Sequence, residues 1–346
     1  FMQNIGKKIL DKILLIRTDR FGEFILNIPA FRVVREEFPD SHIAVMVQPY
    51  AREIIEGNPD VNEIITYNSN KQKGIWQSLK LICFLREKKF DLVIIFNPSK
   101  KFNIITFFAG IPKRVGYNRK WGFLLTHKIE DKKYLGEKHE VEYNLDLVQA
   151  AGCKLQATSK EKRTILYPIS YILYPIQISL KKEDEEFIER QLTENDVSKD
   201  ESLLAIHPFT SNPKKQWAIE NFVELAHKIS QWKKTKVVII GGKDERELSR
   251  KYFVNINVID WTGELSLRQT AVLLKRCKLL ISCDSGPVHL AAAVETPAAV
   301  IFRSGISGVG AKRWGPWGKG HIIEKENLDQ ISVEEVLKAV QQILNK

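Results

Sequence analysis

The sequence predicts an α/β protein made of two doubly wound domains. Short apolar runs of strand length alternate with stretches of helical periodicity in both halves of the chain, which is the pattern of βαβ units with parallel strands. The run at 92–96 has no polar face, as expected where helices cover both sides of a parallel sheet. At 346 residues the chain also exceeds the usual size of a single hydrophobic core.

In the first half the apolar pattern predicts four strands and three helices. The strands are 13–16, 43–47, 64–66 and 92–96, and the helices are 25–38, 74–88 and 140–151. Residues 164–180 have a β-rich composition without charge, and an acidic helix start follows at 183–186. We therefore place the domain junction near residue 180, which gives a first domain over 1–180.

The second half repeats the alternation of strands and helices. The strands are 203–206, 237–240, 258–259, 279–282 and 298–302, and the helices are 221–232, 245–251, 267–276, 288–294 and 333–344. The second domain is expected over 181–330, followed by a C-terminal helix in 331–346 that can pack back on the first domain. Ligands of doubly wound sheets bind outside the carboxyl ends of the strands, so the loops after strands are the candidate sites.

Composition and missing motifs exclude several classes. No apolar run reaches the roughly 18 residues of a transmembrane helix, and the start of the chain lacks the apolar stretch of a signal peptide. Four cysteines without a CxxC pair indicate reduced thiols of a cytoplasmic protein. The absence of GxxxxGK[ST] and GxGxxG argues against an NTPase or a nicotinamide enzyme. There is no Asp-x-Asp pair for a metal-bound sugar nucleotide, and the histidines show no metal-ligand spacing, so we expect no metal.

The positive charge is concentrated in the first half. Residues 1–177 hold 28 Lys and Arg against 19 Asp and Glu, whereas residues 178–346 hold 25 against 23. The first half would therefore attract an anionic partner, which at this level is a nucleic acid, an anionic lipid or an anionic sugar acceptor.

Two loops of the second half have the chemistry of an anion site. Residues 283–289 follow an apolar strand and open a helix with Asp284, Ser285 and Gly286, so free backbone N–H groups are expected there. Residues 207–217 follow another strand and hold hydroxyls and lysines, which suit a pyrophosphate. The structural alternatives are a well-capped strand-to-helix turn and a solvated connector.

Two glycine-containing loops and one charged loop are weaker candidates. Residues 241–245 begin with a glycine pair that permits close approach of the backbone to a ligand, and in residues 261–266 Ser266 can cap a helix. In residues 17–24, Asp19 and Glu23 stand among arginines. The two alternatives for that loop are a salt-bridged helix start and a general base.

These loops together form a set that resembles a known family. The carrying motifs are Arg-x-Asp-x-x-Gly-Glu at 17–23, His-Glu-Val-Glu-Tyr-Asn-Leu at 139–145, Lys-Gln-Trp at 215–217, Gly-Gly at 241–242, Gly-Glu-Leu-Ser-Leu at 263–267 and Asp-Ser-Gly-Pro-Val-His-Leu at 284–290. The sequence is similar to the ADP-heptose:lipopolysaccharide heptosyltransferase family, glycosyltransferase family 9, over nearly its whole length.

The resemblance implies a GT-B fold, in which two Rossmann-like domains face a central cleft with the acceptor on the first and the donor on the second. It implies inverting, metal-independent transfer of a heptose from an ADP-linked donor to a lipopolysaccharide core or a similar anionic glycolipid. The nucleotide sugar is a substrate, and no cofactor is expected. The location implied is cytoplasmic and peripheral at the inner membrane.

Site residues follow from the matched motifs. The donor side is expected to comprise Thr210, Ser211, Lys215, Gly241, Gly242, Glu245, Gly263, Leu265, Asp284, Ser285, Gly286 and His289. Lys215 would hold the pyrophosphate and stabilise its charge, Glu245 would reach the ribose and Leu265 would pack on the base. Glu23 stands where the family has a catalytic aspartate, about one methylene farther from the backbone, and Asp19 is the reserve candidate.

The acceptor side is expected to be basic. Its candidates are Arg17, Arg20, Lys113, Arg114, Arg119 and Lys120. Residues 92–129 contain no acidic side chain and interleave lysines and arginines with aromatic residues. Such a segment suits an anionic membrane surface.

Three other functions remain open on the sequence. A sugar-nucleotide epimerase of the same architecture would keep the fold and change the chemistry. A non-catalytic sugar-nucleotide-binding protein could result from the change of aspartate to Glu23. A basic nucleic-acid-binding protein would use the charged first half, although no helix-turn-helix, RRM or zinc signature is present.

Overall fold

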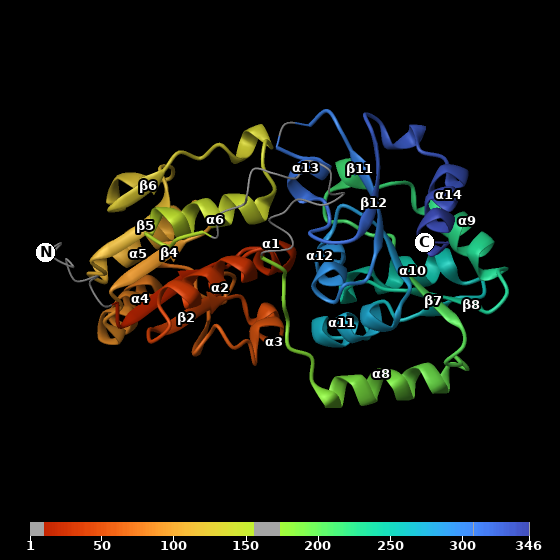
Figure 1. Ribbon diagram of the computed structural model, residues 1–346, viewed down its shortest axis with the longest axis horizontal. Helices are drawn as coiled ribbons and strands as arrows, with labels where there is room; N and C mark the ends of the chain where they lie inside the picture. Colours follow the sequence, from red (N-terminus) through yellow and green to blue (C-terminus); the bar gives the residue numbers. More distant parts are fainter. Residues whose placement is uncertain (1–9, 156–173, 307, 346) are drawn as a thin grey trace, which may run out of the picture. The chain divides into compact units, whose positions relative to one another are not determined.

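The computed structural model describes residues 10–155, 174–306 and 308–345, and the chain divides into two compact units (Figure 1). The first unit comprises Phe1–Arg20, Asn27–Lys132 and Val141–Ala157, and the second comprises Phe21–Leu26, Lys133–Glu140 and Thr158–Lys346. Each unit is built around a six-stranded sheet in which the paired strands run parallel. The predicted α/β class with two doubly wound halves is therefore confirmed.

In the first unit the sheet has the strand order β3-β2-β1-β4-β5-β6. The strands are β1 (Lys12–Ile16), β2 (His42–Val47), β3 (Glu63–Thr66), β4 (Leu92–Ile95), β5 (Lys113–Tyr117) and β6 (His127–Ile129). The chain adds strands on one side of β1 and then returns to its other side with β4, which makes the β1–β4 boundary the switch point. The central strands are fully buried, and this explains their unbroken apolar sequences.

The helices of the first unit are α2 (Ile28–Glu37), α3 (Arg52–Ile55), α4 (Ile75–Lys88), α5 (Lys100–Phe108) and α6 (Glu140–Ala150). The sequence predicted three of them, which correspond to α2, α4 and α6, and missed α3 and α5. The predicted helix 25–38 starts later, at Ile28, because a separate short helix, α1 (Phe21–Ile25), precedes it and belongs to the second unit. Pro29 lies in the first turn of α2, where its missing N–H leaves no hydrogen bond unmade.

The sheet of the second unit has the order β12-β11-β10-β7-β8-β9. Its strands are β7 (Ser202–His207), β8 (Thr235–Ile239), β9 (Ile259–Asp260), β10 (Leu279–Cys283), β11 (Ala298–Arg303) and β12 (Gly320–Lys325). Its helices are α1, α8 (Lys182–Glu194), α9 (Ile219–Ser230), α10 (Arg246–Phe253), α11 (Leu267–Arg276), α12 (Gly286–Ala293), α13 (Ala311–Trp314) and α14 (Val333–Leu344). Ser266 caps α11 through the main-chain N–H of Gln269, as predicted.

Two sequence expectations about the junction and the C-terminus have different outcomes. The β-rich interpretation of 164–180 falls largely outside the described residues, and 174–180 contain no helix or strand. Helix α14 belongs to the second unit, where its buried Val336, Ala339 and Val340 are part of the core. The expectation that this helix also packs back on the first domain stays a prediction. None of the described helices is both long and apolar enough to span a bilayer.

A buried ion pair joins α8 to α11 within the second unit. Arg268 Nε lies 2.5 Å from Asp184 Oδ2, and both side chains are 9% exposed. A solvent-exposed pair, Lys275 with Glu185, joins the same two helices at 3.2 Å. The two pairs therefore differ mainly in burial.

We expect Asp184→Ala to destabilise the protein by about 3–5 kcal/mol, because the buried guanidinium of Arg268 loses its short ion pair with a buried carboxylate. The control Glu185→Ala removes the exposed partner and should cost less than about 1 kcal/mol. Urea unfolding of both variants measures the difference. Equal losses of stability would contradict the importance of burial at this junction.

Candidate functional site

The candidate site lies at the carboxyl edge of the second sheet. Strands β7 and β10 are neighbours across the switch point, with His207 paired to Ser282. The loops that follow them, 208–218 and 284–285, therefore start side by side, as the sequence analysis required of a ligand site. The segment after β11 starts at the same edge, because β11 runs parallel to β10.

Lys215 and Asp284 connect the two loops directly. Lys215 Nζ donates a hydrogen bond to Asp284 Oδ2 at 2.5 Å, and the Asp284 side chain is 8% exposed. Burial raises the pKa of Asp284, and the charge of Lys215 opposes that rise. The structure thus brings together the two charged residues that the sequence assigned to the donor phosphates.

A neutral polar cluster lies beneath this ion pair. His207 Nδ1 is 3.2 Å from Ser282 Oγ and 3.1 Å from Ser285 Oγ, and the two hydroxyls are 2.8 Å apart. Burial lowers the pKa of His207 to about 4, so its ring is uncharged at neutral pH. Its 3.9 Å approach to Glu245 is therefore not an ion pair.

The glycine loops after β8 and β9 are held close to each other. Gly263 N donates to Gly241 O at 2.9 Å, and Gly263 has a φ of +76°, which favours glycine. Glu245 accepts the N–H of Gly242 at 2.6 Å, and burial raises its pKa. This carboxylate therefore stabilises the turn of its own loop.

The remaining donor candidates differ in exposure. Ser211 is exposed, whereas Thr210 and Leu265 are half-buried. Thr210 Oγ1 accepts a hydrogen bond from Asn212 N at 3.4 Å, within the loop after β7. Thr210 and Ser211 lie in the loop after β7, and Leu265 lies in the loop after β9. Their roles toward a ligand stay predictions.

Helix α1 packs directly on the first turn of α12. A Cβ added to Gly286 would lie 2.1 Å from Phe21 Cζ, and one added to Gly22 would lie 2.9 Å from Gly286 Cα. Both positions therefore require glycine. This contact places half-buried Glu23, the next residue of α1, beside the loop that carries Asp284.

His289 offers a hydrogen-bonding atom to this region. Its ring is 3% exposed, and its Nδ1 has no hydrogen-bond partner among the described residues. Burial lowers its pKa to about 3, so the ring is neutral. A buried polar atom without a partner is costly unless something else satisfies it, and a bound ligand would do so.

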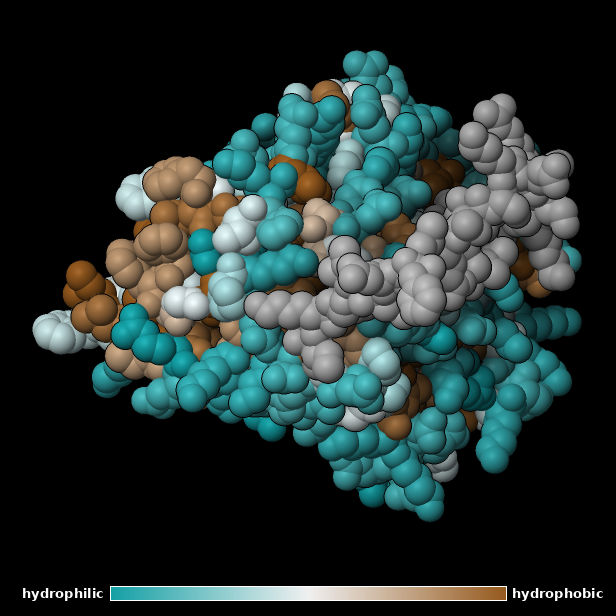
Figure 2. Space-filling view, turned by 60° about the vertical axis from the view of Figure 1, so that its left-hand side comes forward, coloured by the Kyte–Doolittle hydropathy of each residue, from teal (hydrophilic) through white to brown (hydrophobic). Residues whose placement is uncertain are grey.

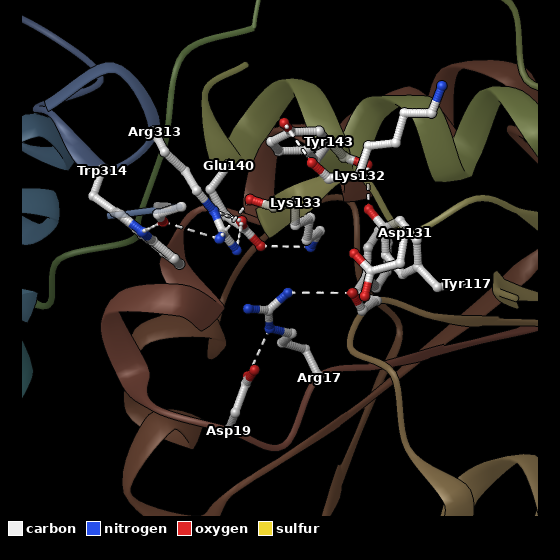
Figure 3. A network of polar contacts seen from close by, with 12 residues as sticks. Arg17, Asp19, Tyr117, Asp131, Lys132, Lys133, Glu140, Tyr143, Arg313 and Trp314 are labelled. Atoms are coloured by element: carbon white, nitrogen blue, oxygen red, sulfur yellow. Dashed lines mark hydrogen bonds and ion pairs between the residues drawn. The ribbon is translucent and has the colours of Figure 1, made fainter. Parts of the chain in front are cut away.

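Sequence reasoning missed a buried ion network in the second unit. Glu140 is fully buried; its Oε1 is 2.6 Å from Lys133 Nζ and its Oε2 is 2.9 Å from an Arg313 Nη (Figure 3). Arg313 also donates to the main-chain oxygens of Lys133 and Gly308. Glu140 and Lys133 are 173 and 180 residues away from Arg313 in sequence, and Gly308 is 5 residues away, so no local motif could reveal this network.

Arg313 adds a second cation to the site. The positive charge of its guanidinium lowers the pKa of Asp284, as the charge of Lys215 does, and both oppose the larger rise caused by burial. The ring of Trp314 lies 4.5 Å from Arg313 Cζ and 6.0 Å from Lys215 Nζ. The sequence signal for Arg313 and Trp314 was their position in the segment that follows β11, at the carboxyl edge of the sheet.

The candidates of the first unit have varied surroundings. Arg17 is 3% exposed and donates to Asp19 Oδ1 at 2.6 Å (Figure 3) and to Phe96 O, so Asp19 accepts a charged partner. Arg20 is exposed. These contacts favour a structural part for Arg17 at the end of β1.

The four basic candidates near β5 divide into two kinds. Lys113 donates to Ala151 O, and Arg114 donates to Leu124 O and Ile111 O. Arg119 and Lys120 are exposed, and Arg119 pairs with Asp131 at 3.0 Å. Lys113 and Arg114 therefore stabilise the local backbone, which leaves Arg119 and Lys120 directed to solvent.

Comparison with known proteins identifies the family. The model of glycosyltransferase family 9 (heptosyltransferase) matches residues 78–336. The chain belongs to glycosyltransferase family 9. It is thus a glycosyltransferase, as the resemblance implied, and the Lys215–Asp284 site lies within the matched region.

Individual relatives agree with the family 9 assignment. Lipopolysaccharide heptosyltransferase 2 of Escherichia coli (strain K12) is 25% identical over 301 residues, covering 84% of this chain and 82% of the relative. A family 9 structure from Veillonella parvula superposes with a TM-score of 0.81 at 20% identity, covering 97% and 98% of the two chains. The E. coli ADP-heptose lipopolysaccharide heptosyltransferase II structure gives 0.77 at 23% identity, covering 96% and 98%. The two structures show that the family 9 fold extends over nearly the whole chain.

Three buried histidines of the second unit predict a pH dependence of stability. Burial lowers the pKa of His139 and His207 to about 4 and that of His289 to about 3, below the roughly 6.5 of an unfolded chain. The unfolded state therefore binds the protons. The stability that the neutral rings contribute is complete above pH 6.5 and is lost as the pH falls toward 4.

We expect His207→Asn to remove the proton uptake on unfolding that this histidine causes. Between pH 7 and pH 5 the wild type should lose about 2 kcal/mol more stability than this variant. Urea unfolding at the two pH values measures it, with His127→Asn, at an exposed position of the first unit, as the control. Parallel losses in wild type and His207→Asn would show that His207 is not held neutral.

Proposed function

We propose that this enzyme transfers a heptose from ADP-heptose to a hydroxyl of a lipopolysaccharide core or a similar anionic glycolipid, with inversion and without a metal. The observation that carries the proposal is the Lys215–Asp284 pair at the head of α12, with Arg313 beside it. The names of the relatives support a heptose donor and a lipopolysaccharide acceptor, and one solved relative is named for ADP-heptose. The proposed location is the cytoplasm, at the inner membrane.

The donor phosphates are proposed to bind between the loops after β7 and β10. Lys215 and Arg313 supply two positive charges there, and the N-terminal end of α12 adds the positive end of its helix dipole. Asp284 holds Lys215 in position before the donor arrives. His289 Nδ1 is a donor or acceptor for the same ligand, since it has no partner among the described residues.

The reaction is a single displacement. Glu23 takes the proton of the acceptor hydroxyl while that oxygen forms a bond to the anomeric carbon, and the bond from this carbon to the diphosphate oxygen breaks. The electron pair leaves with ADP, whose growing negative charge Lys215, Arg313 and the α12 N-terminus stabilise without reorganising. In this mechanism the fixed cations do what a metal ion does in metal-dependent glycosyltransferases.

Lys215→Ala should weaken ADP binding by about tenfold or more and slow transfer, because one charge on the diphosphate is lost. Lys214→Ala is the matched control, since Lys214 is the exposed neighbour on the same turn. Isothermal titration with ADP measures the affinity, and thermal unfolding verifies that the variant is folded. Unchanged affinity for Lys215→Ala would show that the phosphates bind elsewhere.

Glu23→Gln should reduce transfer by roughly 100- to 10,000-fold while ADP affinity is kept, since the base is lost and the volume is nearly preserved. The comparison variant is Asp19→Asn, whose carboxylate is already bonded to Arg17. Turnover of ADP-heptose is measured with excess EDTA throughout. A mild Glu23→Gln with an inactive Asp19→Asn would exchange the two roles, and activity that requires added magnesium or manganese would refute the metal-free mechanism. Turnover without an acceptor would favour the epimerase alternative.

A further inference from the structure

The first unit exposes large apolar side chains on one contiguous surface. Of the fourteen exposed large hydrophobic residues among the described positions, eight belong to α4, α5 and the turn after β5. They are Ile75, Trp76, Leu79, Phe84, Phe107, Phe108, Trp121 and Phe123. Figure 2 shows hydrophobic side chains gathered on the left of the view, with hydrophilic ones around them. Scattered single residues of this kind need no explanation, but a gathered set indicates a binding surface.

Hydrogen bonds join the three segments to one another. Their exposed residues therefore belong to neighbouring parts of the surface, which we treat as one face. Arg86 of α4 donates to Phe108 O of α5 at 2.7 Å. Asn103 of α5 donates to Lys120 O at 3.0 Å, next to Trp121. We call the surface formed by the eight residues the α4–α5 face.

Helix α4 has apolar side chains on both of its sides. Leu81 and Leu85 are buried in the core of the first unit. Ile75 and Trp76 are 71% and 76% exposed, and Leu79 is 44% exposed. At 100° per residue Trp76 and Leu79 lie on the side of the helix opposite the two leucines, and Ile75 lies beside Leu79. Helices on the surface of a soluble domain normally place polar residues there.

The charge around this face is strongly positive. Residues 71–128 contain thirteen lysines and arginines and two carboxylates, an excess equal to the formal net charge of +11 of the whole chain. Cations also stand over its exposed rings: Lys88 Nζ is 5.4 Å from the centroid of Phe84, and Lys100 Nζ is 4.3 Å from that of Trp121. A surface of aromatic and aliphatic side chains bordered by lysines complements an anionic lipid bilayer, with rings at the headgroup level and ammonium groups toward the phosphates.

We propose that the α4–α5 face docks this protein on an anionic lipid bilayer, with the N-terminal part of α4 entering the headgroup region. Burial of apolar side chains and attraction of basic ones act together there, and two such signals are what reversible membrane binding requires. The proposal rests on the proposed function for its biological sense, because the acceptor is lipid-linked. Lipid binding itself does not depend on the reaction.

A single labelled cysteine tests the docking directly. Cys83 lies on the exposed side of α4 and is the exposed one of the four cysteines, the other three being buried. The full-length protein labelled there with the dye NBD is mixed with vesicles of phosphatidylglycerol and phosphatidylethanolamine. The dye emission should shift to the blue, and brominated acyl chains should quench it. A protein carrying Cys83→Ser and Lys251→Cys, labelled on the second unit, should show neither effect.

Matched substitutions separate this surface from general stickiness. Ile75→Ser, Trp76→Ser and Leu79→Ser together should weaken vesicle binding by about tenfold or more. Leu248→Ser, Val254→Ser and Ile322→Ser together are the control, since these residues of the second unit are also exposed, at 44%, 70% and 44%. Binding should fall by a similar factor when phosphatidylcholine replaces phosphatidylglycerol, and when Lys80, Lys100 and Lys120 are changed to Gln. Thermal unfolding verifies that all variants are folded.

Equal vesicle binding by wild type and the α4 triple variant overturns the proposal. A second result also overturns it: the wild type sediments as a dimer and binds no vesicles, and the triple variant is a monomer. The face would then bind a second copy of the chain. ADP binding and transfer to a detergent-solubilised acceptor should be unchanged in the triple variant. Their absence in the wild type would instead refute the proposed function and leave the lipid result standing.

Discussion

The Lys215–Asp284 ion pair is the interaction on which the account of this site depends. A buried carboxylate is costly unless a cation accompanies it, so Asp284 fixes the ammonium of Lys215 at the carboxyl ends of β7 and β10. The switch point of the sheet determines where the two loops meet, and the sequence determines that one carries the cation and the other its partner. Arg313 is fixed in the same way by fully buried Glu140. A site with two cations held by buried carboxylates is prepared for a polyanion before one binds, which limits the cost of reorganisation.

Glycine at two positions determines where the proposed base lies. Side chains at Gly22 or Gly286 would overlap with the opposing helix, so α1 reaches the first turn of α12 only with these residues. Glu23 follows Gly22 on the same short helix, and its longer side chain extends from a backbone that is already close to the donor loop. A glutamate, in place of the aspartate that the family resemblance implies, is therefore compatible with a base at this position.

The sequence predicted the parts of the fold and site that depend on local pattern. The central strands β1, β4, β7 and β10 were predicted because both faces of each strand are covered, and such strands have continuous apolar sequences. The strands β5, β6 and β12 were missed, because edge or near-edge strands carry charged residues such as Lys113 and Glu324. Pro29 could have indicated the break between α1 and α2.

Lys215 and Asp284 were found as residues of loops after strands, whereas the Glu140–Arg313 pair joins positions 173 apart in sequence and depends on tertiary structure alone. Exposure of the apolar side of α4 was likewise invisible, since its periodicity resembles that of a buried helix.

Ligand-dependent thermal unfolding tests the central claim, that the second unit holds a nucleoside diphosphate without a metal. The protein is heated with ADP, GDP, UDP or CDP in the presence of EDTA. A ligand that binds the native state at 100 times its Kd stabilises by about 2.7 kcal/mol. ADP should raise the unfolding temperature of the wild type most, and EDTA should not reduce the shift. Protection that appears only with added divalent metal, or no protection by any of the four, would contradict this claim.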